Sequence, residues 1–346
     1  MTSILSNKTV LVTGHTGFKG SWLCIWLREL GARVIGYALE PHTPLDNFVV
    51  SGLRDKVDSN IGDIRDYDKL ESIFDNYHPE IVFHLAAQPI VRLSYDMPRL
   101  TYDTNLIGTV NVLDCCRLSD SVKVIINVTS DKCYENKEWV WGYRENDVLG
   151  GHDPYSSSKA CSEIITSAYR DSFFKDKYVS TVRAGNVIGG GDWQFGRIVP
   201  DCIKSLKQGN SIGVRNLLSV RPWQFVLEPL KGYIMLAEKM CTDGGKYSGA
   251  WNFAPGQCST TTVKELVTRI IHYWGSGSYT DLSGQQEQLV ESRTLSLDIS
   301  KSVNMLGWSP VLSIDEAVRY TTEWYKNPGP DYEFCVNQIR EYSKVI

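Results

Sequence analysis

A glycine-rich turn lies between an apolar segment and an amphipathic stretch close to the start of the sequence. Residues 9–13 are apolar or β-branched, and Gly14, Gly17 and Gly20 follow them at G-x-x-G-x-x-G spacing. The next residues place apolar side chains at helical spacing as far as Gly31. Glycines let the chain turn sharply and bring backbone N–H groups and a helix start against a pyrophosphate. Because strand, turn and helix occur in register, the pattern favours a dinucleotide-binding unit over a tight turn without a ligand.

Four more apolar segments continue this alternation, at residues 33–38, 81–86, 124–129 and 179–184. Each is apolar or β-branched on both faces, which is typical of strands in a parallel sheet that helices cover on both sides. We therefore predict an α/β fold with a Rossmann-type doubly wound parallel sheet and right-handed crossovers. After residue 185 glycines cluster and short strands, loops and helices mix, which indicates a smaller mixed α/β C-terminal domain.

These patterns predict how the chain divides into domains. Residues 1–185 are expected to form the dinucleotide-binding Rossmann domain. A helical pattern at residues 230–240 predicts that about residues 222–250 return to it. Residues 186–221 and 251–346 then form the smaller, substrate-binding domain.

Composition excludes several classes of function. The sequence has 36 Lys+Arg against 40 Asp+Glu, a net charge of −4, so it offers no basic field for nucleic acid. Its nine cysteines are an odd number without a C-x-x-C pair, so we predict neither a disulfide framework nor a metal site. No signal-peptide pattern and no membrane-spanning apolar run is found. We therefore expect a reduced, cytoplasmic protein with no membrane partner.

The residues after the second strand bear on the choice between NAD and NADP. Glu40 lies 20 residues after Gly20, near the usual place of an acidic residue that binds the cofactor ribose. No Lys or Arg between Val34 and Leu53 is available for a 2′-phosphate, which favours NAD. Asp63 fits either an adenine-edge contact or a solvated turn. The bulky side chains of the turn, His15, Phe18 and Lys19, are expected to face solvent or the cofactor edge.

A Y-x-x-x-K pattern runs from Tyr155 to Lys159, in a helix predicted to start after Pro154. The i, i+4 spacing puts the phenol and the ammonium on one face. A nearby positive charge lowers the pKa of a phenol toward neutrality, as general-base catalysis requires. Ser130 lies at the carboxyl end of the fourth predicted strand, where α/β sheets place their sites. With the glycine turn, this resembles an extended short-chain dehydrogenase/reductase that acts on nucleotide sugars.

Asp131 and Lys132 narrow the reaction type. They place a carboxyl group and an amine directly after the Ser130 hydroxyl. Loss of water needs an acid for the departing hydroxyl and a base for a carbon proton. Epimerases similar to this chain usually have neutral residues there, so the pair favours a dehydratase, with an exposed loop pair as the alternative.

Four sequence blocks strengthen the resemblance, at residues 13–23, 128–137, 150–159 and 221–226. They read TGHTGFKGSWL, VTSDKCYENK, GGHDPYSSSK and RPWQFV. These blocks resemble the CDP-glucose 4,6-dehydratase family, whereas TDP-sugar relatives usually carry Thr-Asp-Glu at positions 130–132. The last 100 residues carry fewer recognisable motifs.

The resemblance implies a set of cofactor contacts. The glycine turn should hold the pyrophosphate of NAD, and Asp63 with the strand end Leu85-Ala86-Ala87 should flank the adenosine half. The implied NAD-binding residues are Gly14, His15, Thr16, Gly17, Phe18, Lys19, Gly20, Glu40, Asp63, Ile64, Leu85, Ala86, Ala87, Asn105, Tyr155 and Lys159.

The resemblance also implies catalytic roles. Tyr155 removes the sugar 4-hydroxyl proton, Ser130 positions that hydroxyl, and Lys159 holds the nicotinamide ribose and tunes Tyr155. Hydride passes from C4 to NAD, neutral Lys132 takes the C5 proton, and Asp131 protonates the leaving 6-hydroxyl. Return of hydride to C6 gives the 4-keto-6-deoxy sugar, a precursor in deoxysugar and O-antigen synthesis.

The substrate implied is CDP-glucose, and its cytosine rests on the resemblance alone. Candidate diphosphate-binding residues are Asn186, Arg197 and Arg221, although each arginine is equally expected as a domain-bridging ion-pair partner. A nucleotide-sugar epimerase or reductase of the same fold and a non-catalytic NAD-sensing protein remain as alternatives. Relatives pair through the helices that carry Asn105 and Tyr155, which implies a homodimer or a higher homo-oligomer.

Overall fold

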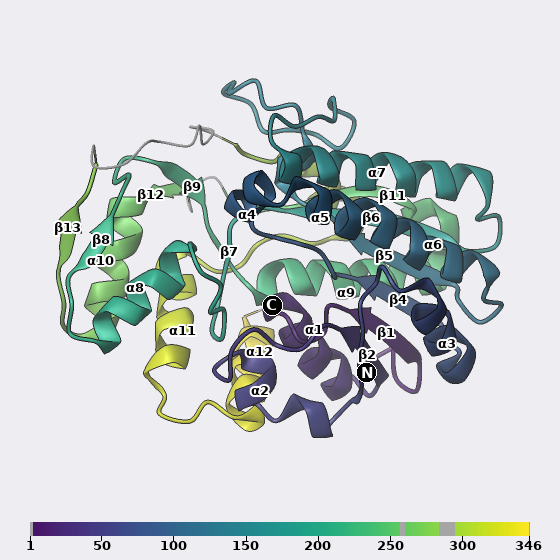
Figure 1. Cartoon of the computed structure of the whole chain (residues 1–346), viewed down its shortest axis with the longest axis horizontal. Coiled ribbons are helices and arrows are strands. Elements are labelled where there is room, and N and C mark those ends of the chain that lie inside the picture. Colours follow the sequence, from purple (N-terminus) through teal and green to yellow (C-terminus); the bar gives the residue numbers. More distant parts are fainter. Residues whose placement is uncertain (1–2, 257–259, 284–294, 346) are drawn as a thin grey trace.

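Seven parallel strands form the central sheet of the computed structural model, which describes residues 3–256, 260–283 and 295–345 (Figure 1). In order across the sheet they are β3 (Asp58–Ile61), β2 (Arg33–Ala38), β1 (Thr9–Thr13), β4 (Ile81–His84), β5 (Val124–Val128), β6 (Tyr178–Ala184) and β11 (Gly249–Phe253). The strand order reverses between β1 and β4. In a doubly wound sheet this reversal opens a crevice beyond the carboxyl ends of the strands, where ligands bind.

Helices cover both faces of the sheet. On one face lie α1 (Phe18–Glu29), α9 (Leu227–Asp243) and α12 (Tyr332–Lys344), and on the other lie α3 (Tyr67–Tyr77), α6 (Gly108–Leu118) and α7 (Pro154–Ser172) (Figure 1). Alternate residues of each strand enter different cores: Val10 and Val12 pack with α1, whereas Leu11 packs with α3 and α6. Because successive strand side chains point to opposite faces, this explains why the inner strands carry apolar residues on both faces.

Shorter elements surround this sandwich. Between β2 and α6 lie α2 (Asn47–Val50), η1 (Leu53–Asp55), α4 (Val91–Asp96), α5 (Pro98–Tyr102) and the π-helical turn η2 (Asp103–Ile107). The 3-10 turn η3 (Asp131–Cys133) follows β5, and η4 (Gly244–Tyr247) precedes β11. None of the helices in the described part of the chain is long and apolar enough to cross a membrane.

A second region extends to the left of the sheet in Figure 1. It contains three two-stranded ribbons: β7 (Val187–Ile188) with β10 (Gln224–Phe225), β8 (Ile212–Val214) with β13 (Tyr279–Asp281), and β9 (Val220–Pro222) with β12 (Thr260–Thr262). Its helices are α8 (Ile198–Lys207), α10 (Val263–Trp274) and α11 (Ile314–Lys326). This region overhangs the carboxyl end of the sheet. The π-helical turn η6 (Ser302–Leu306) instead packs against α9 and β11 at the sheet.

The predicted α/β class and the doubly wound parallel sheet are confirmed, and all five predicted strands are present. The predicted division into domains stays a prediction. Two observations bear on it: β11 pairs with β6 as far as Phe253, three residues beyond the predicted boundary at 250, and α12 packs against α1.

Candidate functional site

The glycine turn lies directly against the end of β4. Gly14 has a φ of +77°, and a Cβ placed on it would lie 2.7 Å from the Ala86 nitrogen. A Cβ on Gly20 would lie 2.0 Å from the Gly14 oxygen. Only glycine fits these close approaches. Gly17 caps α1 without a side-chain hydrogen bond, and the first turn of α1 holds no acidic residue. The N–H groups of the first helical turn have no partner within the helix. Together with the positive end of the helix dipole, they suit the pyrophosphate of a dinucleotide.

The bulky side chains of the turn differ in their surroundings. His15 is fully buried, Nε2 lies 2.7 Å from the Ser59 hydroxyl, and burial with the charge of Arg54 lowers its pKa to about 4. The expectation of a solvent-facing His15 is therefore wrong for its imidazole. Lys19 is half-buried, and burial together with the charge of Arg197 lowers the pKa of its amine to about 8. Phe18 packs against Gly189, where a Cβ would lie 3.0 Å from its ring.

Four predicted NAD-binding residues, in the turn and just after β4, lie next to the ends of β1 and β2. The Thr16 hydroxyl donates to the Leu39 carbonyl at 2.8 Å, just past β2. The Leu85 amide donates to the Thr13 carbonyl at 3.1 Å, and the Ala86 amide to the Thr13 hydroxyl at 3.3 Å. Ala87 is the next residue along the chain. The turn and the residues after β4 therefore form one continuous backbone surface.

The predicted adenosine-side residues occupy the same edge of the sheet. Glu40 forms an ion pair with Arg54 at 2.5 Å, and Arg54 lies just past the interval in which the sequence has no Lys or Arg. Asp63 accepts two hydrogen bonds from the Arg65 guanidinium, which holds the pKa of Asp63 below its usual value. Ile64 is buried beneath Gly108.

Asn105 connects two parts of the candidate site. Its Oδ1 accepts from the Gln88 amide at 2.8 Å, and its Nδ2 donates to the Ser158 hydroxyl at 2.8 Å. Gln88 lies just after β4 and Ser158 lies on α7, between Tyr155 and Lys159. Asn105 therefore fixes α7 relative to the end of β4.

Tyr155 and Lys159 project from the first turns of α7, as predicted. Pro154 occupies the first helical position and the Asp153 side chain accepts from the Ser156 amide, which fixes where the helix begins. Lys159 Nζ donates to the Val128 carbonyl at 3.2 Å, at the carboxyl end of β5. Ser130, Asp131 and Lys132 follow β5 directly, so both predicted groups of catalytic residues meet at this strand end.

The geometry of η3 places the acid beside the hydroxyl. The Ser130 hydroxyl donates to Asp131 Oδ1 at 2.9 Å and accepts from the Lys132 amide at 3.2 Å. A Cβ on Gly185 would lie 2.8 Å from Asp131 Oδ2, so glycine there leaves room for the carboxyl group. Asp131 is buried, and the exposed-loop alternative for this residue is wrong.

Burial dominates the pKa values of the candidate catalytic groups. Burial raises the pKa of Asp131, which favours the protonated form that a general acid needs, while the charge of Lys132 opposes this rise. Burial, with a smaller contribution from Lys19, lowers the pKa of Lys159 to about 8.

Tyr155 differs from the expectation of a phenol poised near neutrality. Burial raises the pKa of Tyr155 to about 12, and the Ser130 hydroxyl and the charge of Arg197 oppose this rise only in part. Desolvation outweighs the nearby charges because the phenolate loses more by leaving water than these groups return. A further positive charge beside the ring would lower this pKa.

The predicted diphosphate-binding residues are not equivalent. Arg197 pairs with Asp192 at 2.6 Å, and its charge acts on Tyr155 and Lys19, so it lies near the catalytic residues. Asn186 follows Gly185, and its carbonyl accepts from the Gln224 amide at 2.9 Å. Arg221 lies in the β9–β12 ribbon and donates to the Val220 carbonyl at 2.9 Å.

Sequence reasoning missed several residues of the site. Asp192 pairs with Arg197, Gln88 binds Asn105, and the Ser94 hydroxyl accepts from the Tyr155 amide at 3.2 Å. Glu163 follows Lys159 by four residues, and this i, i+4 spacing was a signal that it lies on the same helix face as Tyr155 and Lys159.

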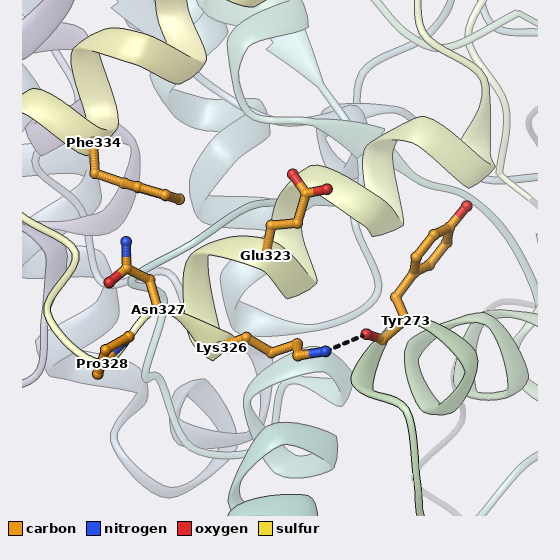
Figure 2. Close-up of a pocket in the computed structure, with 6 residues that line it drawn as sticks. All are labelled: Tyr273, Glu323, Lys326, Asn327, Pro328 and Phe334. Atoms are coloured by element: carbon orange, nitrogen blue, oxygen red, sulfur yellow. Dashed lines mark hydrogen bonds between the residues drawn. The ribbon is translucent and has the colours of Figure 1, made fainter.

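A separate hollow lies between α10, α11 and the start of α12, as Figure 2 shows. Its lining residues are Tyr273, Glu323, Lys326, Asn327, Pro328 and Phe334. Lys326 Nζ donates to the Tyr273 carbonyl across its mouth at 3.1 Å. No predicted site residue lines it. In the described ranges, no group of three or more His, Cys, Asp or Glu is arranged to hold a metal ion.

Comparison with protein families gives a match over most of the chain. The sequence profile described as GDP-mannose 4,6-dehydratase matches residues 11–321. A CDP-glucose 4,6-dehydratase from Salmonella typhimurium is 48% identical over 345 residues, covering 97% of this chain and 96% of that protein. A UDP-glucose 4-epimerase from Mycolicibacterium smegmatis is 27% identical, covering 92% of this chain and 98% of that protein.

Solved structures share the fold at lower identity. The dTDP-glucose 4,6-dehydratase from Bacillus anthracis, in complex with NAD, has a TM-score of 0.75 at 22% identity and covers 93% of this chain and 97% of that one. The UDP-glucose 4-epimerase from Thermotoga maritima, with UDP-glucose, has a TM-score of 0.78 at 24% identity and covers 92% and 98%. Dehydratases and epimerases therefore share this architecture, and the fold alone does not separate them.

Proposed function

The chain belongs to the GDP-mannose 4,6-dehydratase family, and from this premise we propose that it is an NAD-dependent CDP-glucose 4,6-dehydratase. It converts CDP-glucose into CDP-4-keto-6-deoxyglucose and water. The observation that carries this proposal is the Ser130–Asp131–Lys132 turn at the end of β5, in which Ser130 and Asp131 are buried and Lys132 is half-buried. It supplies an acid and an amine beside the Tyr155–Lys159 helix. An epimerase has no use for that acid, because it removes no hydroxyl group.

NAD supplies a hydride acceptor at C4 of the sugar and a hydride donor at C6. The glycine turn and the free N–H groups of α1 are suited to its pyrophosphate, as the tight contacts at Gly14 and Gly20 support. The residues after β2, β3 and β4 would hold the adenosine half. Glu40, already paired with Arg54, lies on this side.

Tyr155 accepts the proton of the sugar 4-hydroxyl in this proposal. Its pKa of about 12 would fall when a cationic ring binds beside it, because an added positive charge favours the phenolate. Ser130 orients the hydroxyl, and Lys159, held on the Val128 carbonyl, orients the ribose and adds positive charge.

Asp131 and Lys132 then perform the elimination. The 4-ketone makes the C5 proton acidic, and the Lys132 amine removes it and returns a proton to C5 when hydride adds to C6. Asp131 donates its proton to the leaving 6-hydroxyl, and its raised pKa supports this role because the proton is retained to higher pH. Arg197, with Asn186 and Arg221, is proposed to hold the sugar diphosphate, since an arginine fork matches phosphate oxygens.

The substrate proposal is tested by incubating the purified protein and NAD with CDP-glucose, UDP-glucose and dTDP-glucose in parallel. We expect a 4-keto-6-deoxy product from CDP-glucose, detected by mass loss of one water and by the absorbance of the ketosugar in alkali. A product of unchanged mass, epimerised at C4, would support the epimerase instead. NAD binding without any product would contradict both enzymes.

A homodimer is part of the proposal. Ile107 on η2 and Ile164 on α7 are 51% and 56% exposed, although both are apolar. Exposed apolar side chains on neighbouring helices favour a partner surface. We expect light scattering to report a dimer or a higher oligomer, and a double variant with Ile107→Glu and Ile164→Glu to report monomer. The control Leu218→Glu alters an exposed leucine of the second region, and monomer in the unmodified chain would contradict the proposal.

A cytoplasmic location is also proposed. The eight described cysteines are all free thiols, which is expected in a reducing compartment. Supply of a deoxysugar precursor for surface polysaccharide follows from the proposed product.

A further inference from the structure

A buried ion pair lies beneath the catalytic turn. Arg183 on β6 and Glu163 on α7 meet in two parallel hydrogen bonds of 2.8 Å and 2.7 Å, and each side chain is only 3% exposed. Both carboxylate oxygens also accept from hydroxyl groups, one from Thr129 and the other from Thr181. The pair is therefore fully hydrogen-bonded at the carboxylate.

Both ends of the catalytic turn are attached to this pair. Thr129, which donates to Glu163, directly precedes Ser130. Tyr134 directly follows Cys133, its hydroxyl accepts from Arg183 Nη1 at 2.6 Å, and its ring lies 4.8 Å from the Arg183 guanidinium carbon. The four residues Ser130 to Cys133 thus form a bridge between two anchors on one ion pair.

The turn makes few hydrogen bonds of its own: the Ser130 hydroxyl donates to Asp131 Oδ1 at 2.9 Å and accepts from the Lys132 amide at 3.2 Å. Its backbone closes with a Cys133–Ser130 bond of 3.2 Å and a Tyr134–Asp131 bond of 3.5 Å. A single short 3-10 turn is not stable alone, because few hydrogen bonds offset the ordering of its residues. External anchors must therefore set where the Asp131 and Lys132 side chains lie.

The Glu163–Arg183 pair also connects the turn to the helix that carries Tyr155 and Lys159. Glu163 lies four residues after Lys159 and eight after Tyr155, so all three share one face of α7. A buried ion pair contributes little to stability compared with apolar residues of the same size, so its bidentate geometry indicates another use. The two parallel hydrogen bonds fix how Arg183 and Glu163 are oriented relative to each other, which contact between two apolar side chains would not do.

We propose that the Glu163–Arg183 pair, acting through Thr129 and Tyr134, is a positioning element that holds Asp131 and Lys132 in register with Tyr155 and Lys159. This inference rests on the proposed dehydratase function. It predicts that loosening the Tyr134 anchor impairs elimination more than oxidation. Tyr155 and Lys159 are held by α7 itself, and Ser130 remains next to the end of β5, where the Thr129 amide donates to the Val182 carbonyl at 2.9 Å.

Tyr134→Phe is the sharpest test, because it removes only the hydroxyl that joins Arg183 to Asn252 and keeps the ring stacked on Tyr143. With CDP-glucose, we expect KM to stay within about twofold and elimination to fall roughly tenfold relative to oxidation. NADH absorbance should then accumulate before product appears. Glu163→Gln should shift this ratio further and also lower the unfolding temperature.

Tyr342→Phe is the matched control. Tyr342 is fully buried and its hydroxyl donates to Glu228 at 3.0 Å, at the α9–α12 side of the molecule. It should lower the unfolding temperature without changing the ratio of elimination to oxidation. Equal losses of both steps in Tyr134→Phe would show a merely structural role and overturn the proposal.

Hydrogen exchange provides a readout that is independent of turnover. Amides of residues 130–134 should exchange at least about tenfold faster in Tyr134→Phe and in Glu163→Gln than in the unmodified chain or in Tyr342→Phe. Unchanged exchange would overturn the proposal even if the enzyme is a dehydratase. Absence of ketosugar from the unmodified chain would instead contradict the proposed function, and the exchange rates would still decide the positioning role.

Discussion

Tyr155→Phe is expected to lower the rate of CDP-glucose oxidation by roughly 10²–10⁴-fold, the range for loss of a general base. The substitution removes one oxygen and keeps the ring, so the packing of this buried side chain should survive. Stopped-flow measurement of NADH formation gives the oxidation rate, and thermal unfolding confirms that the variant is folded.

The control for this prediction is Tyr332→Phe. Tyr332 is also a buried tyrosine, and its hydroxyl donates to Glu29 at 2.9 Å, on the α1–α12 side of the molecule. Oxidation by this variant should match the unmodified chain. Near-normal turnover by Tyr155→Phe would show that another group removes the 4-hydroxyl proton.

The central sheet was predictable wherever its strands are buried on both faces. The segments at residues 9–13, 33–38 and 124–129 carry apolar residues on both faces because each face packs under helices. β3 was missed because Asp58–Ile61 lies at the sheet edge and is largely polar, with all four residues half-buried. An edge strand of this composition has no apolar pattern to detect.

The proposed catalytic residues form two groups that are close in the sequence, so spacing alone was enough to single them out as candidates. Ser130, Asp131 and Lys132 are consecutive, and Tyr155 and Lys159 are one helical turn apart. Their meeting at the end of β5 follows from where parallel sheets place their sites.

Contacts between distant segments were not predictable. The pairs Asn105–Gln88 and Arg197–Asp192 depend on loop paths that the sequence pattern does not specify. His15 was expected to face solvent or the cofactor edge, and the solvent-facing alternative is wrong because Gly36 on β2 leaves room for its ring to turn inward. A Cβ on Gly36 would lie 2.2 Å from His15 Cδ2, so this burial depends on a residue 21 positions away.

Asp131→Asn is expected to separate oxidation from elimination. Asparagine keeps the shape of the side chain and can still interact with Ser130, but it has no proton to transfer. The 6-hydroxyl leaves poorly without protonation, so we expect ketosugar formation to fall by at least roughly 100-fold. The first hydride transfer needs no acid at this position and should stay within severalfold of the unmodified rate.

Lys132→Met should give the same separation for a different reason. Methionine retains most of the length of the side chain but lacks the amine that removes the C5 proton. With this variant, the C5 hydrogen of bound substrate should not exchange with deuterated solvent. With Asp131→Asn, the amine remains and exchange at C5 should continue.

Single-turnover reaction of Asp131→Asn with CDP-glucose and NAD, followed by the absorbance of NADH, tests the account most directly. We predict a burst of NADH that forms at nearly the unmodified rate and persists, while ketosugar is delayed by at least roughly 100-fold. Loss of NADH formation in proportion to ketosugar formation would contradict the account, because Asp131 would then act in binding or folding instead of in the elimination step.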